Sequence, residues 1–281
     1  MRNIIPNVVT IAGVDPSGGA GVLADIKTFS ALGAYGCGVI AALTAQNTRT
    51  VSGVHTPPID FLRLQIDTLF TDVDIHAVKI GMLGSVDIIA AVAERLAHFN
   101  APYVVTDPVM IAKSGDRLLA KNAIAELRDT LLPQTFMLTP NLPEAGTLLE
   151  QRPPDTLREM FRAVERLRDM LPLSSEHWIM LKGGHLPGND IVDLLFDGDR
   201  MIELQAQRID TANTHGTGCT LSSAIAALLP QYAEAPSPVE SAVRHAREYL
   251  QQAIATSGRL SVGHGHGPVH HFHAHRLAAQ N

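Results

Sequence analysis

Short apolar runs rich in β-branched residues alternate along the chain with longer segments of helical periodicity. Turn residues follow each run, as they do where parallel strands lead into crossover helices. The runs are VVTIA at 8–12, AVKI at 77–80, YVVTD at 103–107, FMLT at 136–139 and WIML at 178–181. Crossover helices cover a sheet from both sides, so the alternation predicts an α/β fold with a mostly parallel central sheet and helices on both faces.

Two of the intervening segments place their apolar residues on one helical face. These residues are Val86, Ile89, Ala90, Ala93, Leu96 and Ala97 in the first segment and Leu157, Phe161, Val164 and Leu167 in the second. Residues 191–210 differ, because two β-like runs flank an Asp-Gly turn and predict an antiparallel hairpin at a sheet edge. The composition suggests neither a linker nor a repeat, so we expect one domain over residues 1–281.

Composition and charge exclude several classes of protein. The chain has 281 residues, of which 46% are hydrophobic, and its net charge of −6 provides no basic surface for a nucleic acid. Cys37 and Cys219 fit neither a disulfide framework nor a zinc site, which is typical of a reducing compartment. No stretch reaches the roughly 18 apolar residues of a membrane span, and the N-terminus carries no signal-cleavage pattern. We therefore expect a cytoplasmic protein that binds neither membranes nor nucleic acid.

Ligands of open α/β sheets lie beyond the carboxyl ends of the strands, so residues just after each predicted strand are the first candidates. The glycine-rich segment AGVDPSGGAG at 12–21 lacks the spacing of a Walker A or dinucleotide motif. It is either a loop that cradles a substrate or a tight strand-to-helix turn. Asp25 in the following helix either points into the crevice toward a substrate amine or hydroxyl, or is an acid favoured near a helix N-terminus. Gln46 offers a donor and an acceptor that suit the edge of a heterocycle.

Apolar and charged residues follow the other predicted strands. Met82 and Val109 are either walls around a flat ring or core residues. Asp107 and Glu144 are candidate Mg²⁺ ligands, although Glu144 also lies in a first helical turn, where the dipole alone favours an acid. Lys182 ends the apolar run WIML before two glycines and suits a triphosphate.

The segment NTHGTGCTL at 213–221 leads into an apolar helix. The N–H groups of Gly216, Thr217, Gly218 and Cys219 are expected to be free there, and the helix dipole favours an anion at the same place. The same field is expected to lower the pKa of the Cys219 thiol, so that its thiolate accepts a hydroxyl proton. The alternative is a buried, inert cysteine.

Nine segments, in order along nearly the whole chain, resemble the hydroxymethylpyrimidine/phosphomethylpyrimidine kinases of the ribokinase-like superfamily. They are AGVDPSGGAG, ADIKTFSALGAYGCGVI, TAQNT, KIGML, DPVMIAKSGD, LTPNLPEA, KGGH, NTHGTGCTLSSAIAA and GHGPVHHF. The resemblance implies a three-layer ribokinase-like fold. It also implies an ATP- and Mg²⁺-dependent enzyme of thiamine biosynthesis that phosphorylates 4-amino-5-hydroxymethyl-2-methylpyrimidine and then its monophosphate. Relatives of this kind suggest a homodimer.

The resemblance assigns residues to the pyrimidine. Gln46 and the backbone of Gly13 would bind it, and Asp25 would lie beside it. Met82 and Val109 would flank the ring.

Other residues are assigned to phosphate chemistry. Cys219 would stand where sugar kinases of the superfamily carry an Asp base. Lys182, Asn141 and Glu144 would serve the ATP phosphates and Mg²⁺, and the adenine would lie near Val243.

Two other functions remain open at this point. One is a pyridoxal or pyridoxine kinase of the same superfamily, which would not accept the pyrimidine monophosphate. The other is a non-catalytic vitamin-binding protein, against which the retention of Lys182, Glu144 and Cys219 argues, since a binder needs neither base nor metal. Residues 111–116 and 15–21 are lid candidates because of their glycines, and the His-rich residues 264–275 are expected to pack on the core rather than capture a metal.

Overall fold

One mixed sheet runs through the part of the chain that the computed structural model describes, namely residues 5–110, 121–172 and 177–275. Its strand order is β3-β2-β1-β4-β5-β6-β7-β8-β9. The strands are β1 (Asn7–Val14), β2 (Tyr35–Gln46), β3 (Val51–His55), β4 (Ala77–Ile80), β5 (Val104–Thr106), β6 (Met137–Leu138), β7 (Trp178–Leu181), β8 (Asp190–Phe196) and β9 (Met201–Gln207). All the strands from β2 to β7 in this order pair in parallel, which confirms the predicted sheet.

Antiparallel strands close both edges of the sheet. The predicted hairpin is confirmed: β8 and β9 pair with each other, and β8 pairs with β7. The opposite edge carries β3, which is antiparallel to β2 and was not predicted. The five residues of β3 include a glycine and are mostly exposed, so the strand lacks the apolar pattern on which a prediction depends.

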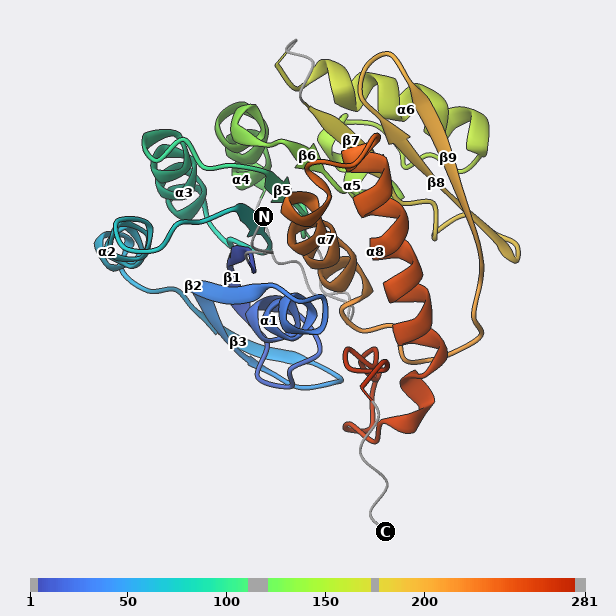
Figure 1. The fold of residues 1–281 in the computed structure, drawn as a ribbon, viewed down its shortest axis with the longest axis horizontal. Helices are drawn as coiled ribbons and strands as arrows, with labels where there is room; N and C mark the ends of the chain where they lie inside the picture. Colours follow the sequence, from blue (N-terminus) through green and yellow to red (C-terminus); the bar gives the residue numbers. More distant parts are fainter. Residues whose placement is uncertain (1–4, 111–120, 173–176, 276–281) are drawn as a thin grey trace.

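Helices cover both faces of the sheet and make it the middle of three layers. They are α1 (Gly21–Ala31), α2 (Ile59–Phe70), α3 (Val86–His98), α4 (Lys121–Glu126), α5 (Leu142–Leu148), α6 (Leu157–Asp169), α7 (Thr217–Leu228) and α8 (Pro238–Ala255). Figure 1 shows α1, α7 and α8 next to one another, with α2, α3 and α4 grouped apart from them. One apolar cluster packs α1, α7 and α8 on the sheet, and a second packs α2, α3, α5 and α6 on its other side.

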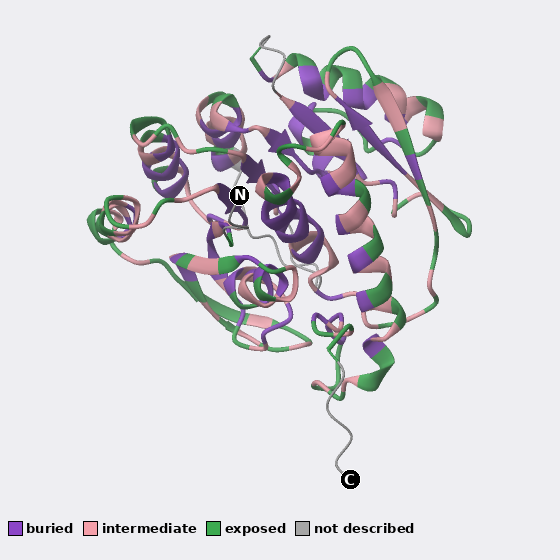
Figure 2. Ribbon diagram, viewed as in Figure 1, coloured by how far each residue is buried: buried purple, intermediate pink, exposed green. Residues whose placement is uncertain are grey.

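Burial is deepest in the inner parallel strands β1, β4, β5, β6 and β7 and in α7, whereas the outward side of α8 is exposed (Figure 2). The face predicted for α3 is partly wrong, since Ala97 is exposed whereas Ile88 and Val92 are buried. The reason is that α3 packs between α2 and α4 as well as on the sheet, so its buried arc is wider than one apolar stripe.

The His-rich C-terminal segment packs against α7 and α8 over residues 267–271, as expected, whereas residues 264–266 are exposed. Val269 and His271 are buried, and the hydroxyl of Tyr249 donates to the carbonyl of His271 at 2.7 Å. Among the described residues, no helix combines the length and apolar character needed to cross a membrane. The lid candidate at 111–116 falls outside the described residues.

Candidate active site

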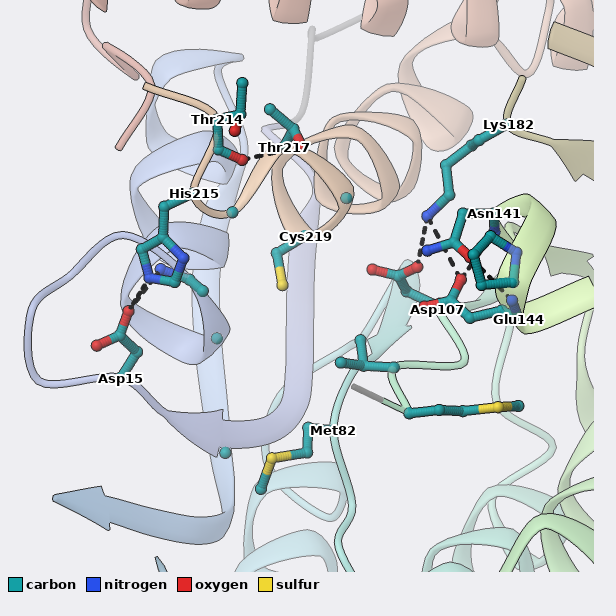
Figure 3. Close-up of a pocket in the computed structure, with 18 of the residues that line it drawn as sticks. Asp15, Met82, Asp107, Asn141, Glu144, Lys182, Thr214, His215, Thr217 and Cys219 are labelled. Carbon is teal, nitrogen blue, oxygen red and sulfur yellow. Dashed lines mark hydrogen bonds and ion pairs between the residues drawn. The ribbon is translucent and has the colours of Figure 1, made fainter. Parts of the chain in front are cut away.

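A cavity of about 430 Å³ lies where the strand-end prediction puts it, at the carboxyl ends of β1, β2, β4, β5, β6 and β7 and the N-terminus of α7. Of the predicted site residues, all but Asp25 and Val243 line this cavity. The predicted residues that line it are Gly13, Gln46, Met82, Asp107, Val109, Asn141, Glu144, Lys182, Gly216, Thr217, Gly218 and Cys219. Figure 3 shows Cys219 pointing into the cavity, with Asp15 and His215 on one side of it and Asp107, Glu144 and Lys182 on the other.

Asp25 is not at the cavity wall, which corrects the expectation that it faces a substrate. Its side chain is fully buried and forms an ion pair with Lys79, whose Nζ lies 2.9 Å from Oδ2. Asp25 is four residues beyond Gly21, so it lies one helical turn below the cavity, and α1 turns it toward the sheet. Lys79 was missed by the sequence analysis, although a lysine inside the apolar strand AVKI signals a buried partner.

Val243 is also not at the cavity. It is fully buried in the apolar cluster between α8 and α7, where Ala242 and Ala246 accompany it. The side chain lies on the inner face of an amphipathic helix and is therefore a core residue, so the expected adenine contact is wrong for Val243 itself.

The entrance of α7 has the backbone shape expected of an anion site. Gly216 caps the helix with φ of 76°, and a Cβ there would overlap the carbonyl oxygen of Gly19 in the glycine-rich loop. The N–H of Thr217 donates to the carbonyl of Thr214 at 3.4 Å, so, contrary to the expectation, this N–H is not free. Gly218 and Cys219 lie in the first turn, where the helix itself offers no carbonyl to the backbone N–H groups.

The pKa of the Cys219 thiol is raised to about 11, which corrects the expected decrease. Burial is the largest cause, and the carboxylates of Asp25 and Asp107 add to it. Lys79 and the backbone N–H of Gly21, which donates to the sulfur, oppose the increase. The helix dipole is evident from sequence, whereas the loss of water around the sulfur is not.

A charged cluster lies across the cavity from the glycine-rich loop. Lys182 Nζ lies 2.9 Å from Oδ1 of Asp107 and 4.0 Å from Oε2 of Glu144 (Figure 3). Burial raises the pKa of Glu144 to about 7; Lys182 lowers it and Asp107 raises it. The two neighbouring carboxylates provide the hard oxygen donors that Mg²⁺ takes together with nucleotide phosphates, so this donor set fits the metal.

Glu144 and Asn141 are fixed by a capping box at the start of α5. The side chain of Asn141 accepts from the N–H of Glu144 at 2.9 Å, and the Glu144 carboxylate accepts from the N–H of Asn141 at 2.8 Å. Glu144 therefore stabilises the N-terminus of α5 and also lines the cavity, so its role at the helix start is compatible with a role as a metal ligand.

A hydrogen bond between Asp15 and His215 joins the glycine-rich loop to the α7 entrance. His215 Nε2 lies 2.7 Å from Oδ2 of Asp15, and the same carboxylate accepts from Ser17 and from the N–H of Ala20. Burial acts to raise the pKa of Asp15, but the hydrogen bonds from His215 and Ser17 outweigh it together. The pKa of Asp15 is therefore below its usual value. The sequence analysis missed this pair because the two residues are 200 positions apart.

The opposite end of the cavity has an apolar wall with an amide at its edge. The N–H of Gly13 donates to the carbonyl of Met82 at 3.0 Å, and a Cβ at Gly13 would lie 3.0 Å from the Met82 methyl carbon. Gln46 faces the cavity beside Thr44, whose hydroxyl lies 3.2 Å from its Oε1. The amide N–H₂ and the wall together suit a flat ring with an acceptor on its edge.

The three-layer α/β fold, with a glycine-capped helix entrance beside a lysine and two carboxylates, is that of the ribokinase-like class of proteins. The chain belongs to the phosphomethylpyrimidine kinase family, whose model matches residues 15–270. It is 51% identical over 268 residues to the hydroxymethylpyrimidine/phosphomethylpyrimidine kinase of Escherichia coli, covering 95% of this chain and 98% of that protein.

Two further relatives extend the comparison. The thiamine biosynthesis bifunctional protein of Geobacter sulfurreducens is 43% identical over 277 residues, which are 98% of this chain and 53% of that protein. The structure of the pyridoxal kinase from Staphylococcus aureus in complex with AMP-PCP and pyridoxal matches with a TM-score of 0.84 and 31% identity, covering 96% of this chain and 94% of that chain.

Proposed function

We propose that this chain is the ATP-dependent kinase that phosphorylates 4-amino-5-hydroxymethyl-2-methylpyrimidine and then its monophosphate in thiamine biosynthesis. The observation that carries the proposal is the position of Cys219. Its side chain projects between the apolar wall at Met82 and the charged cluster of Asp107, Glu144 and Lys182. A membership of the phosphomethylpyrimidine kinase family and the high identity to the Escherichia coli enzyme support it.

The pyrimidine lies, in this proposal, between the apolar wall and the glycine-rich loop. Met82 and Val109 flank the ring, and Gln46 and the backbone of Gly13 meet its polar edge. The Asp15–His215 hydrogen bond keeps the glycine-rich loop against the α7 entrance, so that the ring and the phosphate site keep a fixed separation.

ATP lies along the α7 entrance with its terminal phosphates next to Lys182. The first-turn N–H groups of Gly218 and Cys219 donate hydrogen bonds to the phosphate oxygens, because the helix itself provides no acceptor for these donors. Asp107 and Glu144 would hold Mg²⁺, with Asn141 beside them. When bound, the metal supplies positive charge to the phosphates.

The transfer step forms one bond and breaks another. The hydroxymethyl oxygen forms a bond to the γ-phosphorus while the bond from that phosphorus to the bridging oxygen breaks, and its electron pair leaves with ADP. The hydroxyl proton passes to the thiolate sulfur of Cys219, which thereby becomes the thiol. Lys182 and the α7 amides stabilise the charge that develops on the transferred group.

A pyridoxine kinase is the second candidate, because the Staphylococcus aureus pyridoxal kinase shares the fold so closely. The two functions are separated by an ATP-coupled assay with Mg²⁺ that offers hydroxymethylpyrimidine, its monophosphate and pyridoxine in parallel, with products identified by mass. We expect both pyrimidines to be turned over with much higher kcat/KM than pyridoxine. Turnover of pyridoxine alone would reject the proposal and assign the vitamin B6 reaction.

We also propose a homodimer in the cytoplasm. Large apolar side chains are exposed on β2, β3 and α2, and a second copy of the chain would cover them. They are Tyr35, Leu43, Val54, Phe61 and Leu64. Light scattering should give twice the chain mass of 30.2 kDa, and a single-chain mass at micromolar concentration would contradict the dimer.

A further inference from the structure

Lys79 is a charged side chain in the middle of an apolar strand. It is fully buried in β4, between Val78 and Ile80, on the face of the sheet that carries α1 and α7. A buried ion pair gains little net stability over a well-packed apolar pair, so stability alone does not account for a lysine at this place.

Asp25 keeps Lys79 charged. Lys79 Nζ lies 3.0 and 2.9 Å from the two carboxylate oxygens of Asp25, which also accept from Thr10 at 2.6 Å and from Ser223 at 2.7 Å. Burial is the largest effect on the pKa of Lys79 and lowers it, but Asp25, together with Cys219 and Asp107, raises it by more, so the pKa of the ammonium is raised. Lys79 is therefore a cation at neutral pH.

The ion pair lies one helical turn below Cys219. Asp25 follows Gly21 by four residues in α1, and Ser223 follows Cys219 by four residues in α7, so each helix places these residues in line. The N–H of Gly21 donates a hydrogen bond to the sulfur of Cys219. This hydrogen bond joins the N-terminal ends of α1 and α7.

The ammonium of Lys79 also reaches toward the cavity along its own strand. A Cβ at Gly81 would lie 2.7 Å from Lys79 Nζ, so the ammonium occupies the space that a side chain at this position would fill. Gly81 directly precedes Met82 in the cavity wall.

Four charges surround the thiol. Lys79 of β4 and Lys182 after β7 are the cations, and Asp25 of α1 and Asp107 after β5 are the anions. Lys182 is committed to Asp107 at 2.9 Å and faces the phosphate side, which leaves Lys79 as the cation beneath the sulfur.

We propose that Lys79 is a positioning residue for phosphoryl transfer: its ammonium, held by Asp25, is the fixed buried charge that stabilises the thiolate of Cys219. The catalytic consequence rests on the proposed role of Cys219 as the base, whereas the effect on the thiol does not. Asp25 accordingly acts through Lys79 and not on the substrate.

The test measures the reactivity of Cys219 directly. Purified wild-type and Lys79→Met proteins are treated with iodoacetamide between pH 7 and 10, and the alkylated peptides of Cys219 and Cys37 are quantified by mass spectrometry. Cys37 is half-buried in β2 and packs on the opposite face of the sheet, so it serves as an internal reference for fold integrity. Loss of an opposite charge raises a pKa by about 1–3 units, so Cys219 should react at least about tenfold more slowly relative to Cys37.

A second variant keeps the test valid if Lys79→Met, with its unpaired buried carboxylate, does not fold. Lys79→Met combined with Asp25→Asn removes both charges, and the amide retains partners in Thr10 and Ser223. The inference requires that the ammonium stabilises the thiolate by more than the Asp25 carboxylate destabilises it, so Cys219 should still react more slowly. Thr28→Val is the matched control: Thr28 is buried in α1, and its hydroxyl donates to Ala24 of the same helix.

Kinetics separate this inference from the proposed function. The Lys79 variants should lose kcat by about tenfold or more with little change in the KM of ATP, whereas Thr28→Val should keep both parameters. An unchanged alkylation ratio of Cys219 to Cys37 in the folded double variant would overturn the inference. If Cys219→Ala kept normal turnover while the alkylation ratio fell, the base role would fail and the stabilisation of the thiolate by Lys79 would stand.

Discussion

In the proposed mechanism, Cys219 has the most demanding role among the residues of the site. Its thiol must lose a proton although burial raises its pKa to about 11. With the pyrimidine alcohol as substrate, Cys219→Ala should therefore reduce kcat by roughly 10²–10⁴ while the KM values change little, because a general base acts in the transition state and not in substrate binding. Steady-state kinetics with the alcohol, whose hydroxyl carries the proton that the base removes, check this.

Cys37→Ala is the matched control for that substitution. Cys37 lies in β2 and does not line the cavity, so its loss should leave kcat unchanged. Turnover of Cys219→Ala within a few-fold of the wild type would remove the thiol from the mechanism.

The residues of the site were predictable where position along a strand decides their place. Lys182 and Asp107 come directly after buried strands, and the sheet topology then fixes them at the cavity. Asp25 was placed wrongly because a helical position does not say which way a side chain turns. The pKa of Cys219 was wrong in direction because the sequence gives the helix entrance but not the desolvation of the sulfur.

At the scale of the element, the entrance of α7 depends on a glycine. Gly216 has φ of 76°, and a Cβ there would overlap Gly19. Gly216→Ala should lower the free energy of unfolding by about 1–2 kcal/mol or more, since the left-handed conformation costs that much for other residues, and should raise the KM for ATP. Urea denaturation and kinetics measure the two effects.

Gly258→Ala provides the comparison for Gly216→Ala. A Cβ at Gly258 meets no atom within 4 Å, so this change should stay within about 0.5 kcal/mol of the wild type. Equal stability and equal KM for the two variants would show that the α7 entrance tolerates a side chain.

The start of α5 gives a dependence of stability on pH. The pKa of Glu144 is raised from 4.5 to about 7 in the folded chain, so the folded state holds a proton that the unfolded state has lost between these values. Stability must therefore fall as pH rises from 4.5 to 7. Glu144→Gln keeps the capping box but has no charge, so it should gain roughly 1–3 kcal/mol on the wild type over this range.

Urea midpoints of both proteins at several pH values, without nucleotide or Mg²⁺, test the Glu144 prediction. A stability difference that does not change between pH 4.5 and 7.5 would contradict the raised pKa.

Most elements of the fold were predictable because their residues are patterned locally. AVKI and WIML coincide with β4 and β7, and the Asp-Gly turn gave the edge hairpin. β3 escaped because the short sequence VSGVH is mostly exposed and has no apolar run. The buried face of α3 was predicted only in part, because α3 also packs against α2 and α4 and a local sequence pattern does not show these contacts.

For the whole molecule, the fold explains why two chemically different surfaces face one cavity. The parallel strands end at the same edge of the sheet, so the apolar wall near Met82 and the charged cluster near Lys182 open into one space. The pair of Asp15 and His215 then joins segments 200 residues apart. Such long-range pairs follow from the topology as a whole, which is why the sequence predicted the location of the site better than its internal contacts.

The central claim is that one cavity phosphorylates the pyrimidine alcohol and then its monophosphate. The most direct test supplies the purified monophosphate with ATP and Mg²⁺ and follows the reaction by phosphorus NMR at catalytic enzyme concentration. We expect the monophosphate signal to be replaced by the two coupled signals of a diphosphate ester, with one ADP formed for each diphosphate. ATP consumption with the alcohol but none with the monophosphate would contradict it.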